Sequence, residues 1–595
     1  MDANNIPVLP ESAPFTPEQR AYLNGFFAGL FSRAQTREIA NTTPLTILFG
    51  SQTGNAEGLA KRVARTATRR GFATTVHDLG KYPAAQLASE TRLLIVTSTY
   101  GDGDPPDNAR AFWDFLSSDS APCLKATSFS VCALGDSNYA KFCGFGRALD
   151  ARLESLGANR IHVRGDCDVE YEEPFVKWLD AALRELREQG RLPKDGGARV
   201  LASPDSPVGL DSEEQLPAPN PTHTRDHPFP ATLVRNIRLN GPDSAKDTRH
   251  LEIKLDDPGL AYDVGDALGV IPVNCSAAVG ELLAALECSG EEAVPGRDGT
   301  ELALRDALLR HYEITKIPRS FLEAMTERSG DNALRTLAAA GANGELTRFL
   351  KGREIIDLLL AHPGAKFTPV EFVGLLKKLP PRLYSISSSP NAHPGQVHLT
   401  VSIVRYESLG RPRKGVCSTF LADLIPPHAP VPVFIQKNQQ FRPPPSGHTP
   451  MIMVGPGTGI APFRAFLEER RATGAVGKNW LLFGDQRSNS DFLYREELES
   501  FHDDGLLNRL DLAWSRDQAE KVYVQHRMLE NAGELFDWLE QGASFYVCGD
   551  ASRMARDVDD ALRQVIETGG ARTAAQAADY VKRLVQDKRY LRDIY

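Results

Sequence analysis

Short apolar runs alternate with amphipathic stretches between residues 44 and 190. The runs LTILFG, RLLIVTSTYG and FSVCALG have the length of buried strands, and GLAKRVARTATRRG has helical spacing. Alternation of strand, loop and helix is typical of a parallel sheet covered by helices on both faces. The pattern therefore predicts an α/β domain over residues 44–190.

A different pattern begins near residue 227. The runs ATLVRNIRL, RHLEIKL, DALGVIPV, RLYSISSS, QVHLTVSIVRY and VPVFIQ predict a small antiparallel barrel over residues 227–447. A helical stretch at about 276–379 interrupts these runs and is interpreted as an insertion. From residue 448 to 595, the strands PMIMVGPGTG, WLLFGD, LDLAWS and FYVCGD again alternate with helices, which predicts a second α/β domain.

Two further segments lie outside these domains. Residues 191–226 are rich in Pro, Gly, Ser and Asp without a hydrophobic period, which predicts a flexible linker. Within residues 1–43, apolar side chains of PFTPEQRAYLNGFFAGLFSR recur at helical spacing, which predicts an N-terminal helical segment. This helix either packs on its own neighbouring domain or forms an oligomer contact.

Composition narrows the function. A net charge of −9 weighs against a nucleic-acid or anionic-membrane partner. The eight cysteines form no CxxC pair or Cys/His cluster, so we expect no metal site of the usual spacing, no disulfide scaffold and a reducing, cytoplasmic location. The N-terminus lacks the features of a signal peptide, and the apolar stretch at 23–31 is far short of the roughly 20 residues that span a bilayer.

Three strands of the first α/β domain end in loops that suit a phosphate and a planar ring. Loops after parallel strands gather at one edge of the sheet, where hydroxyls and backbone N–H groups can bind a phosphate. Tyr100 and Tyr139 are placed to sandwich a ring. These residues resemble a flavodoxin-like FMN domain. The loop residues are Ser51, Gln52, Thr53, Gly54, Asn55, Ala56, Ser98, Thr99, Tyr100, Gly101, Leu134, Gly135, Asp136, Ser137, Asn138 and Tyr139.

The barrel carries a second cofactor pattern. A pyrophosphate needs a fixed cation and a small-residue helix start, which Arg382 and the turn Gly415, Val416, Cys417 and Ser418 supply. After Arg382 come Leu383, Tyr384 and Ser385; Tyr384 would pack on a flavin ring and Ser385 would bond its redox-active edge. Together these residues resemble the FAD-binding half of the ferredoxin–NADP reductase family.

The last domain has a nicotinamide-cofactor pattern. Its glycines Gly455, Gly457 and Gly459 alternate and so depart from GxGxxG, but with Thr458 they still form a turn that lets backbone approach a pyrophosphate. The stretch GTGIAPF also resembles the ferredoxin–NADP reductase family. A later cluster offers two cations, a hydroxyl and an aromatic ring for a ribose phosphate, which favours NADPH over NADH. The cluster is Ser515, Arg516, Lys521, Val522, Tyr523, Val524 and Gln525.

Taken together, the chain from residue 45 to residue 595 resembles the diflavin reductases. The resemblance implies that Ser385, Cys548 and Asp593 surround the hydride-transfer site, although a strand cysteine is more often simply packed. It also implies that Tyr595 stacks on the FAD ring and moves for nicotinamide to enter. Further implied cofactor contacts are Cys143, Thr315, Thr400, Val401, Ser402, Tyr406 and Asp557.

Within that family, the chain is most similar to the flavoprotein subunits of assimilatory NADPH–sulfite reductases. The terminal Tyr595 and the opening segment carry this similarity. It implies electron flow from NADPH through FAD and FMN to a separate haem/iron–sulfur sulfite reductase subunit, for cysteine biosynthesis, in a hetero-oligomer. Alternatives are a soluble NADPH reductase for a haem monooxygenase and a flavin-free assembly subunit.

Acidic residues near the FMN loops have two interpretations. They form either a solvated rim or a docking face for a basic partner. They are Asp102, Asp104, Asp107, Asp136, Asp166, Asp168, Glu170, Glu172 and Glu173.

Overall fold

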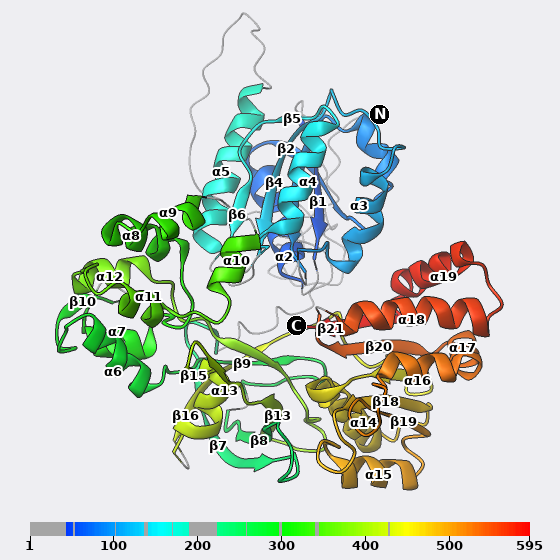
Figure 1. The fold of residues 1–595 in the computed structure, drawn as a ribbon. Helices are drawn as coiled ribbons and strands as arrows, with labels where there is room; N and C mark the ends of the chain where they lie inside the picture. Colours follow the sequence, from blue (N-terminus) through cyan, green and yellow to red (C-terminus); the bar gives the residue numbers. More distant parts are fainter. Residues whose placement is uncertain are drawn as a thin grey trace, which may run out of the picture.

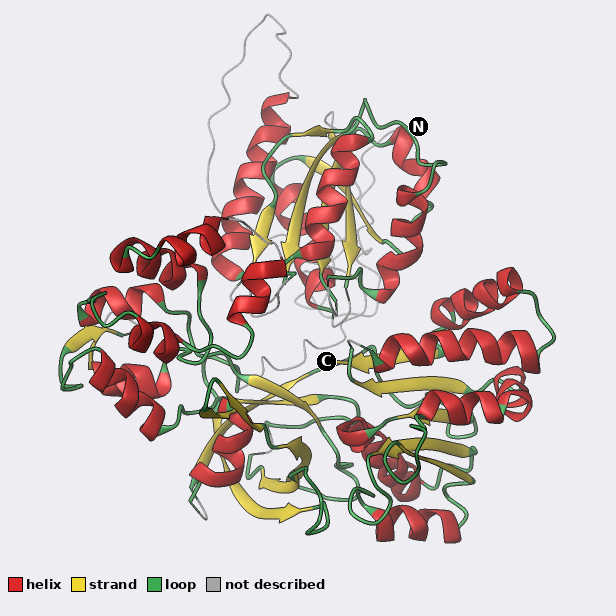
Figure 2. Ribbon diagram, in the orientation of Figure 1, coloured by secondary structure: helices red, strands yellow, loops and turns green. Residues whose placement is uncertain are grey.

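Most of the chain can be described in three dimensions (Figures 1 and 2). The computed structural model describes residues 43–51, 54–100, 103–135, 141–168, 171–189, 223–257, 259–296, 300–339, 344–426, 429–551 and 553–595. The predicted N-terminal helix and the linker up to residue 222 lie outside the described residues.

The first domain has a parallel sheet in the strand order β2-β1-β3-β4-β5, with β6 paired to β4. This is the flavodoxin-like order, in which ligands bind where the order reverses, between β1 and β3. The strands are β1 (Thr43–Gly50), β2 (Phe72–Asp78), β3 (Arg92–Ser98), β4 (Ser128–Leu134), β5 (Asn159–Arg160) and β6 (Gly165–Cys167).

Helices cover both faces of that sheet (Figure 1). One hydrophobic core joins the sheet to α2 and α5, and a second joins it to α3 and α4. The helices are α2 (Asn55–Arg69), α3 (Arg110–Ser117), α4 (Gly144–Ser155) and α5 (Glu172–Gln189), with short 3-10 turns η1 (Ala84–Ser89) and η2 (Asp107–Ala109). The fold predicted from strand–helix alternation is confirmed.

The middle domain is an antiparallel barrel with the strand order β12-β9-β16-β7-β8-β13. A bridge between Ile386 and Leu399 joins the end of β12 to β13. The strands are β7 (Phe229–Arg238), β8 (Thr248–Lys254), β9 (Ala267–Val270), β12 (Arg382–Ser385), β13 (Gln396–Ser402) and β16 (Pro430–Gln436). A hairpin and a short helical turn follow β13: β14 (Arg405–Ser408), β15 (Arg411–Lys414), α13 (Val416–Thr419) and the π turn η3 (Phe420–Leu424).

An insertion between β9 and β12 has its own hydrophobic core. Its helices are α6 (Ser276–Ala285), α7 (Leu304–Arg310), α8 (Arg319–Ser329), α9 (Asn332–Ala339), α10 (Gly344–Leu350), α11 (Ile355–Ala361) and α12 (Pro369–Leu375). The insertion also contains the hairpin β10 (Ala293–Pro295) and β11 (Glu301–Ala303), which the sequence did not predict because strands of three residues show no alternation.

The last domain has a parallel sheet in the order β19-β18-β17-β20-β21. Its strands are β17 (Met451–Val454), β18 (Asn479–Asp485), β19 (Arg509–Trp514), β20 (Ser544–Gly549) and β21 (Tyr590–Ile594). Its helices are α14 (Ala461–Thr473), α15 (Arg495–Asp503), α16 (Val524–Glu530), α17 (Ala532–Glu540), α18 (Met554–Gly569) and α19 (Ala574–Gln586), with the 3-10 turn η4 (Gly457–Ile460).

The last strand touches the first domain. The backbone N–H of Ile594 in β21 donates a hydrogen bond of 3.1 Å to the hydroxyl of Tyr100, which follows β3. The chain terminus accordingly lies between the first and last domains (Figure 1). Among the described helices, none has the length and apolar character needed to cross a bilayer.

Candidate functional site

The turn between β1 and α2 is held in a shape that suits an anion. Ser51 donates its backbone N–H to Asn108 Oδ1 at 2.9 Å, and Asn108 Nδ2 donates to Asp78 Oδ1 at 2.9 Å. Gly54, at φ +92°, donates its N–H to Ser51 Oγ at 3.0 Å and precedes α2. Only glycine takes this conformation without strain, so the turn presents the start of a 15-residue helix.

The neighbouring loop after β3 contains a buried hydroxyl that fits a ligand. Within the described part of the chain, Thr99 Oγ1 is buried and has no hydrogen-bond partner. Such a group is unfavourable unless a ligand bonds it, so these residues fit the phosphate and ring of FMN. The predicted residues Gln52, Thr53, Gly101 and 136–139 lie outside the described residues, and the ring sandwich between Tyr100 and Tyr139 stays a prediction.

Cys143 packs against the loop that follows β4. Its thiol donates to the carbonyl of Ala133 at 3.2 Å, and burial raises the pKa of this thiol to about 12. A side chain at Gly135 would come within 2.7 Å of the Cys143 backbone nitrogen, so only glycine fits there. Cys143 is therefore a neutral packing residue of the loop.

In the barrel, the predicted FAD residues lie on two adjoining elements. Tyr384 and Ser385 are half-buried at the end of β12, whereas Leu383, which precedes them, is exposed. Gly415 precedes α13, and a Cβ atom there would lie 2.7 Å from Ser418 Oγ. This close approach of backbone at a helix start suits a pyrophosphate, so the residues fit FAD.

Ser385, Cys548 and Asp593 meet at one point. Ser385 Oγ donates to Asp593 Oδ2 at 2.6 Å, and the Cys548 thiol donates to the same oxygen at 3.8 Å. The register between β20 and β21 places Cys548 directly opposite Asp593. Burial raises the pKa of both the Asp593 carboxyl and the Cys548 thiol, because no solvent stabilises their charged forms. The group can therefore hold or release a proton.

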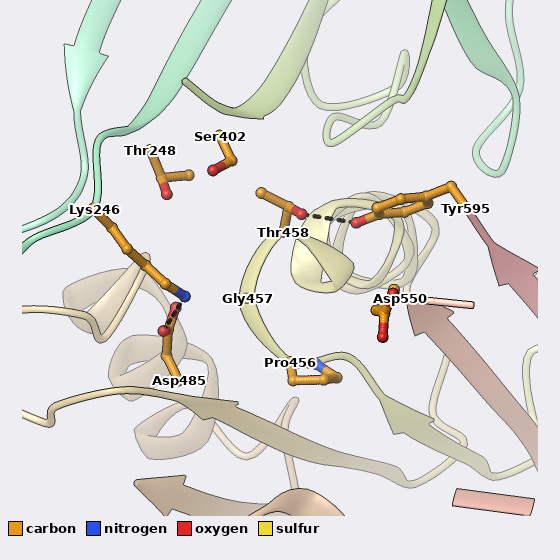
Figure 3. Close-up of a pocket in the computed structure, with 10 residues that line it drawn as sticks. Lys246, Thr248, Ser402, Pro456, Gly457, Thr458, Asp485, Asp550 and Tyr595 are labelled. Carbon is orange, nitrogen blue, oxygen red and sulfur yellow. Dashed lines mark hydrogen bonds and ion pairs between the residues drawn. The ribbon is translucent and has the colours of Figure 1, made fainter. Parts of the chain in front are cut away.

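Tyr595, two residues after Asp593 in the chain, lies over the glycine turn (Figure 3). Its hydroxyl is 2.7 Å from Thr458 Oγ1, and the residue as a whole is 55% exposed. The two residues border a cavity of about 190 Å³. Gly457, at φ +57°, also borders the cavity, where an added Cβ would meet only Asp485 Oδ2, at 3.9 Å. The turn thus leaves room for a cofactor at its backbone.

Sequence reasoning missed part of this cavity. Lys246 from the loop before β8 forms an ion pair with Asp485 at the end of β18, and both line the cavity (Figure 3). The position of Asp485 after a buried strand of a parallel sheet was a usable signal. The sequence held no such signal for Lys246, because its loop belongs to another domain. The remaining lining residues that were not predicted are Thr248, Pro456, Gly549 and Asp550.

Some of the residues predicted to bind the ribose phosphate are exposed, and the others are engaged within the domain. The side chains of Arg516, Lys521 and Tyr523 are exposed and available to a phosphate, while Gln525 Nε2 donates to Asp557 Oδ2 at 3.2 Å. Ser515 Oγ donates to the carbonyl of Asp485 at 3.2 Å. Val522 and Val524 pack into the domain core instead.

Several other residues predicted to contact a cofactor use their side chains for packing or for hydrogen bonds within the protein. The side chains of Leu134, Val401 and Cys417 lie in hydrophobic cores, so any cofactor contact from these residues would come from backbone. Thr400 Oγ1 lies 2.7 Å from the Tyr494 hydroxyl, and Thr315 Oγ1 donates to Glu313 at 2.6 Å. Three more predicted residues have different exposure: Ala56 is buried, Ser402 lines the cavity and Tyr406 is 49% exposed.

Three acidic residues of the rim form ion pairs within the first domain. Asp166 contacts Arg147 and Arg164, Glu172 contacts Arg62, and Glu173 contacts Lys177. Such pairs reduce the net field available to an outside partner.

Comparisons with known proteins agree with the three-domain description. Family models match as Flavodoxin over residues 47–178, FAD binding domain over 221–420 and Oxidoreductase NAD-binding domain over 453–560. The sulfite reductase (NADPH) flavoprotein alpha-component of Bacillus subtilis (strain 168) is 43% identical, covering 99% of this chain and 96% of the relative. The proteins of that name from Vibrio cholerae (strain El Tor Inaba N16961) and Yersinia enterocolitica (strain 8081) are 42% and 41% identical, covering 97% and 98% of this chain and 93% and 96% of the relatives.

Proposed function

Since the chain belongs to the family of sulfite reductase (NADPH) flavoprotein alpha-components, we propose that it supplies electrons for the reduction of sulfite to sulfide. Electrons would pass from NADPH through FAD and FMN to a separate haem/iron–sulfur subunit. The observation that carries the proposal is the meeting of Ser385, Cys548 and Asp593 beside Tyr595 and the glycine turn.

The protein's own side chains would bind and orient the cofactors and hold the protons of the site. The chemistry that bound FAD and FMN would supply is hydride acceptance and single-electron transfer, respectively. Arg516 and Lys521 would bind the ribose phosphate that distinguishes NADPH from NADH. Tyr595 must leave its place beside Thr458 to admit the nicotinamide. Ser385 and Cys548 both donate hydrogen bonds to Asp593. The exchangeable protons of the site are therefore held within one buried network.

The arrangement of domains supports internal transfer. We assign residues 44–190 to FMN, 227–447 to FAD and 448–595 to NADPH, with 191–226 as the linker between the first two. The hydrogen bond from Ile594 to Tyr100 brings the FMN loops against the strand that carries Asp593. Release of this contact would free the FMN domain for the partner, in a hinge motion about the linker.

The proposed setting is a cytoplasmic hetero-oligomer for cysteine biosynthesis. The name alpha-component of the relatives supports a second component. Residues 1–43 are the proposed assembly segment, either between copies of this chain or on the FMN domain.

Anaerobic reduction by NADPH tests the proposal. We expect one FAD and one FMN per purified chain, and sulfite consumption only when a sulfite reductase haemoprotein is also present. If reduced flavins pass electrons to cytochrome c but never to the haemoprotein, the sulfite assignment is wrong and a reductase for a haem monooxygenase becomes the better interpretation. Absence of flavin after reconstitution would contradict both.

A further inference from the structure

Three side chains of metal-ligand type gather on one face of the antiparallel strand pair β8 and β13 in the barrel. His250 and Glu252 are two residues apart on β8, so they point to the same face. His398 lies directly opposite Glu252 on β13. One nitrogen from each imidazole and one carboxylate oxygen of Glu252 all lie within 4.8 Å of one another.

One imidazole nitrogen in this group is buried without a protein partner. His398 is 3% exposed, and its Nδ1 has no hydrogen bond among the described residues. Its other nitrogen, Nε2, lies 3.4 Å from Gln396 Oε1. A buried acceptor left unsatisfied is unfavourable and calls for a ligand.

The second imidazole is oriented as ligating histidines usually are. His250 Nδ1 lies 3.0 Å from the Tyr494 hydroxyl, which lies 2.7 Å from Thr400 Oγ1. These two hydrogen bonds fix the ring of His250 and turn its Nε2 toward Glu252, 3.4 Å away. An outer hydrogen bond of this kind commonly holds a histidine that binds a metal through its other nitrogen.

The surrounding charges leave room for a cation. Arg464 contacts Glu468 and Glu497 at 2.8 and 2.9 Å, so its charge is matched. Arg235 lies 3.2 Å from Glu252 but is largely exposed. His393 also contacts Glu468 at 2.9 Å, so the three carboxylates face two guanidinium groups and one imidazole.

We propose that His250, Glu252 and His398 bind one divalent transition-metal ion. Two imidazole nitrogens and one carboxylate oxygen are a ligand set that zinc accepts, with water completing four-coordination. The ion would cross-link β8 to β13 where Tyr494 and Arg464 of the last domain pack against the barrel. Its role is structural, and no electron passes through it.

Metal content of tag-free, flavin-loaded protein tests this site. After exposure to zinc and dialysis, elemental analysis should give about one zinc per chain for the wild type. His398→Gln and His250→Gln should each lower the affinity for zinc by roughly 10-fold or more. His393→Gln is the matched control, because the ring of His393 contacts that of His398 in a tilted arrangement, with centroids 4.2 Å apart, but lies outside the ligand set.

Cobalt provides a second readout. It does not require a variant with a substituted buried histidine to fold. Co²⁺ added to the wild type should produce visible ligand-field bands, and Glu252→Gln, at the most exposed of the three positions, should weaken them while retaining both flavins. A wild type that binds neither zinc nor Co²⁺, or variants that bind zinc as well as the wild type, would overturn the proposal.

Discussion

At the scale of single residues, the hydride-transfer site depends on a carboxyl group kept away from water. Asp593 accepts hydrogen bonds from both Ser385 and Cys548, and burial raises its pKa. An amide in its place keeps the shape but cannot exchange a proton. We expect Asp593→Asn to slow flavin reduction by NADPH by roughly 10²-fold in anaerobic stopped-flow measurements. Asp587→Asn, an exposed change just before β21, is the control and should leave the rate unchanged.

Tyr595 makes a second prediction at this scale. Its backbone pairs with Gly549 and Ala551, and its hydroxyl bonds Thr458, so nicotinamide entry must break side-chain contacts. Removal of the side chain in Tyr595→Ala should tighten NADP⁺ binding by about 5-fold, the equivalent of about 1 kcal/mol for one hydrogen bond. Isothermal titration calorimetry measures this. Tyr595→Phe keeps the ring and should lie between the two; weaker binding by Tyr595→Ala would contradict a gate.

How far the sequence predicted these residues depends on where each one lies. Ser385, Cys548 and Thr458 stand in or beside motifs whose chemistry can be read locally. Lys246 could not be predicted, because its pairing with Asp485 crosses two domains and more than two hundred residues. Cys417 was assigned to the cofactor by its motif, yet its side chain belongs to the barrel core.

At the scale of elements, the glycine turn η4 and strand β20 are in backbone contact. A Cβ atom at Gly459 would lie 2.1 Å from the carbonyl oxygen of Cys548. Gly459→Ala must therefore displace η4 or β20, and we expect NADP⁺ affinity to fall at least 10-fold in calorimetry while flavin content is retained. Gly533→Ala is the matched control, since a Cβ there meets nothing within 4 Å on α17; equal losses in both variants would argue against the contact.

Element prediction from the sequence succeeded where the pattern was long. Strands β1, β3 and β4 are almost continuously apolar because helices bury both their faces. Strand β21 was not predicted, since YLRDI carries Arg592 and Asp593 at the positions that face the active site and the FMN domain. Functional side chains thus removed the hydrophobic signal from the strand that presents them.

At the scale of the whole molecule, docking of the FMN domain rests on a few specific contacts. Tyr100 accepts the N–H of Ile594, and Asp104 interacts electrostatically with Arg592 on the same strand. Tyr100→Phe removes the acceptor while keeping the ring. We expect it to retain FMN, to slow electron transfer between the flavins by a few-fold and to increase the radius of gyration in small-angle scattering. Tyr312→Phe, in the insertion, is the control; unchanged transfer in Tyr100→Phe would exclude this role.

The same contact makes one amide a natural reporter. β21 is an edge strand, so the N–H of Ile594 is bonded to the FMN domain while the next amide, that of Tyr595, bonds to Gly549 of β20. When the FMN domain leaves, the Ile594 proton becomes free to exchange with deuterium and the Tyr595 proton does not. The ratio of the two exchange rates would therefore measure, without a probe attached to the protein, what fraction of time the molecule spends open.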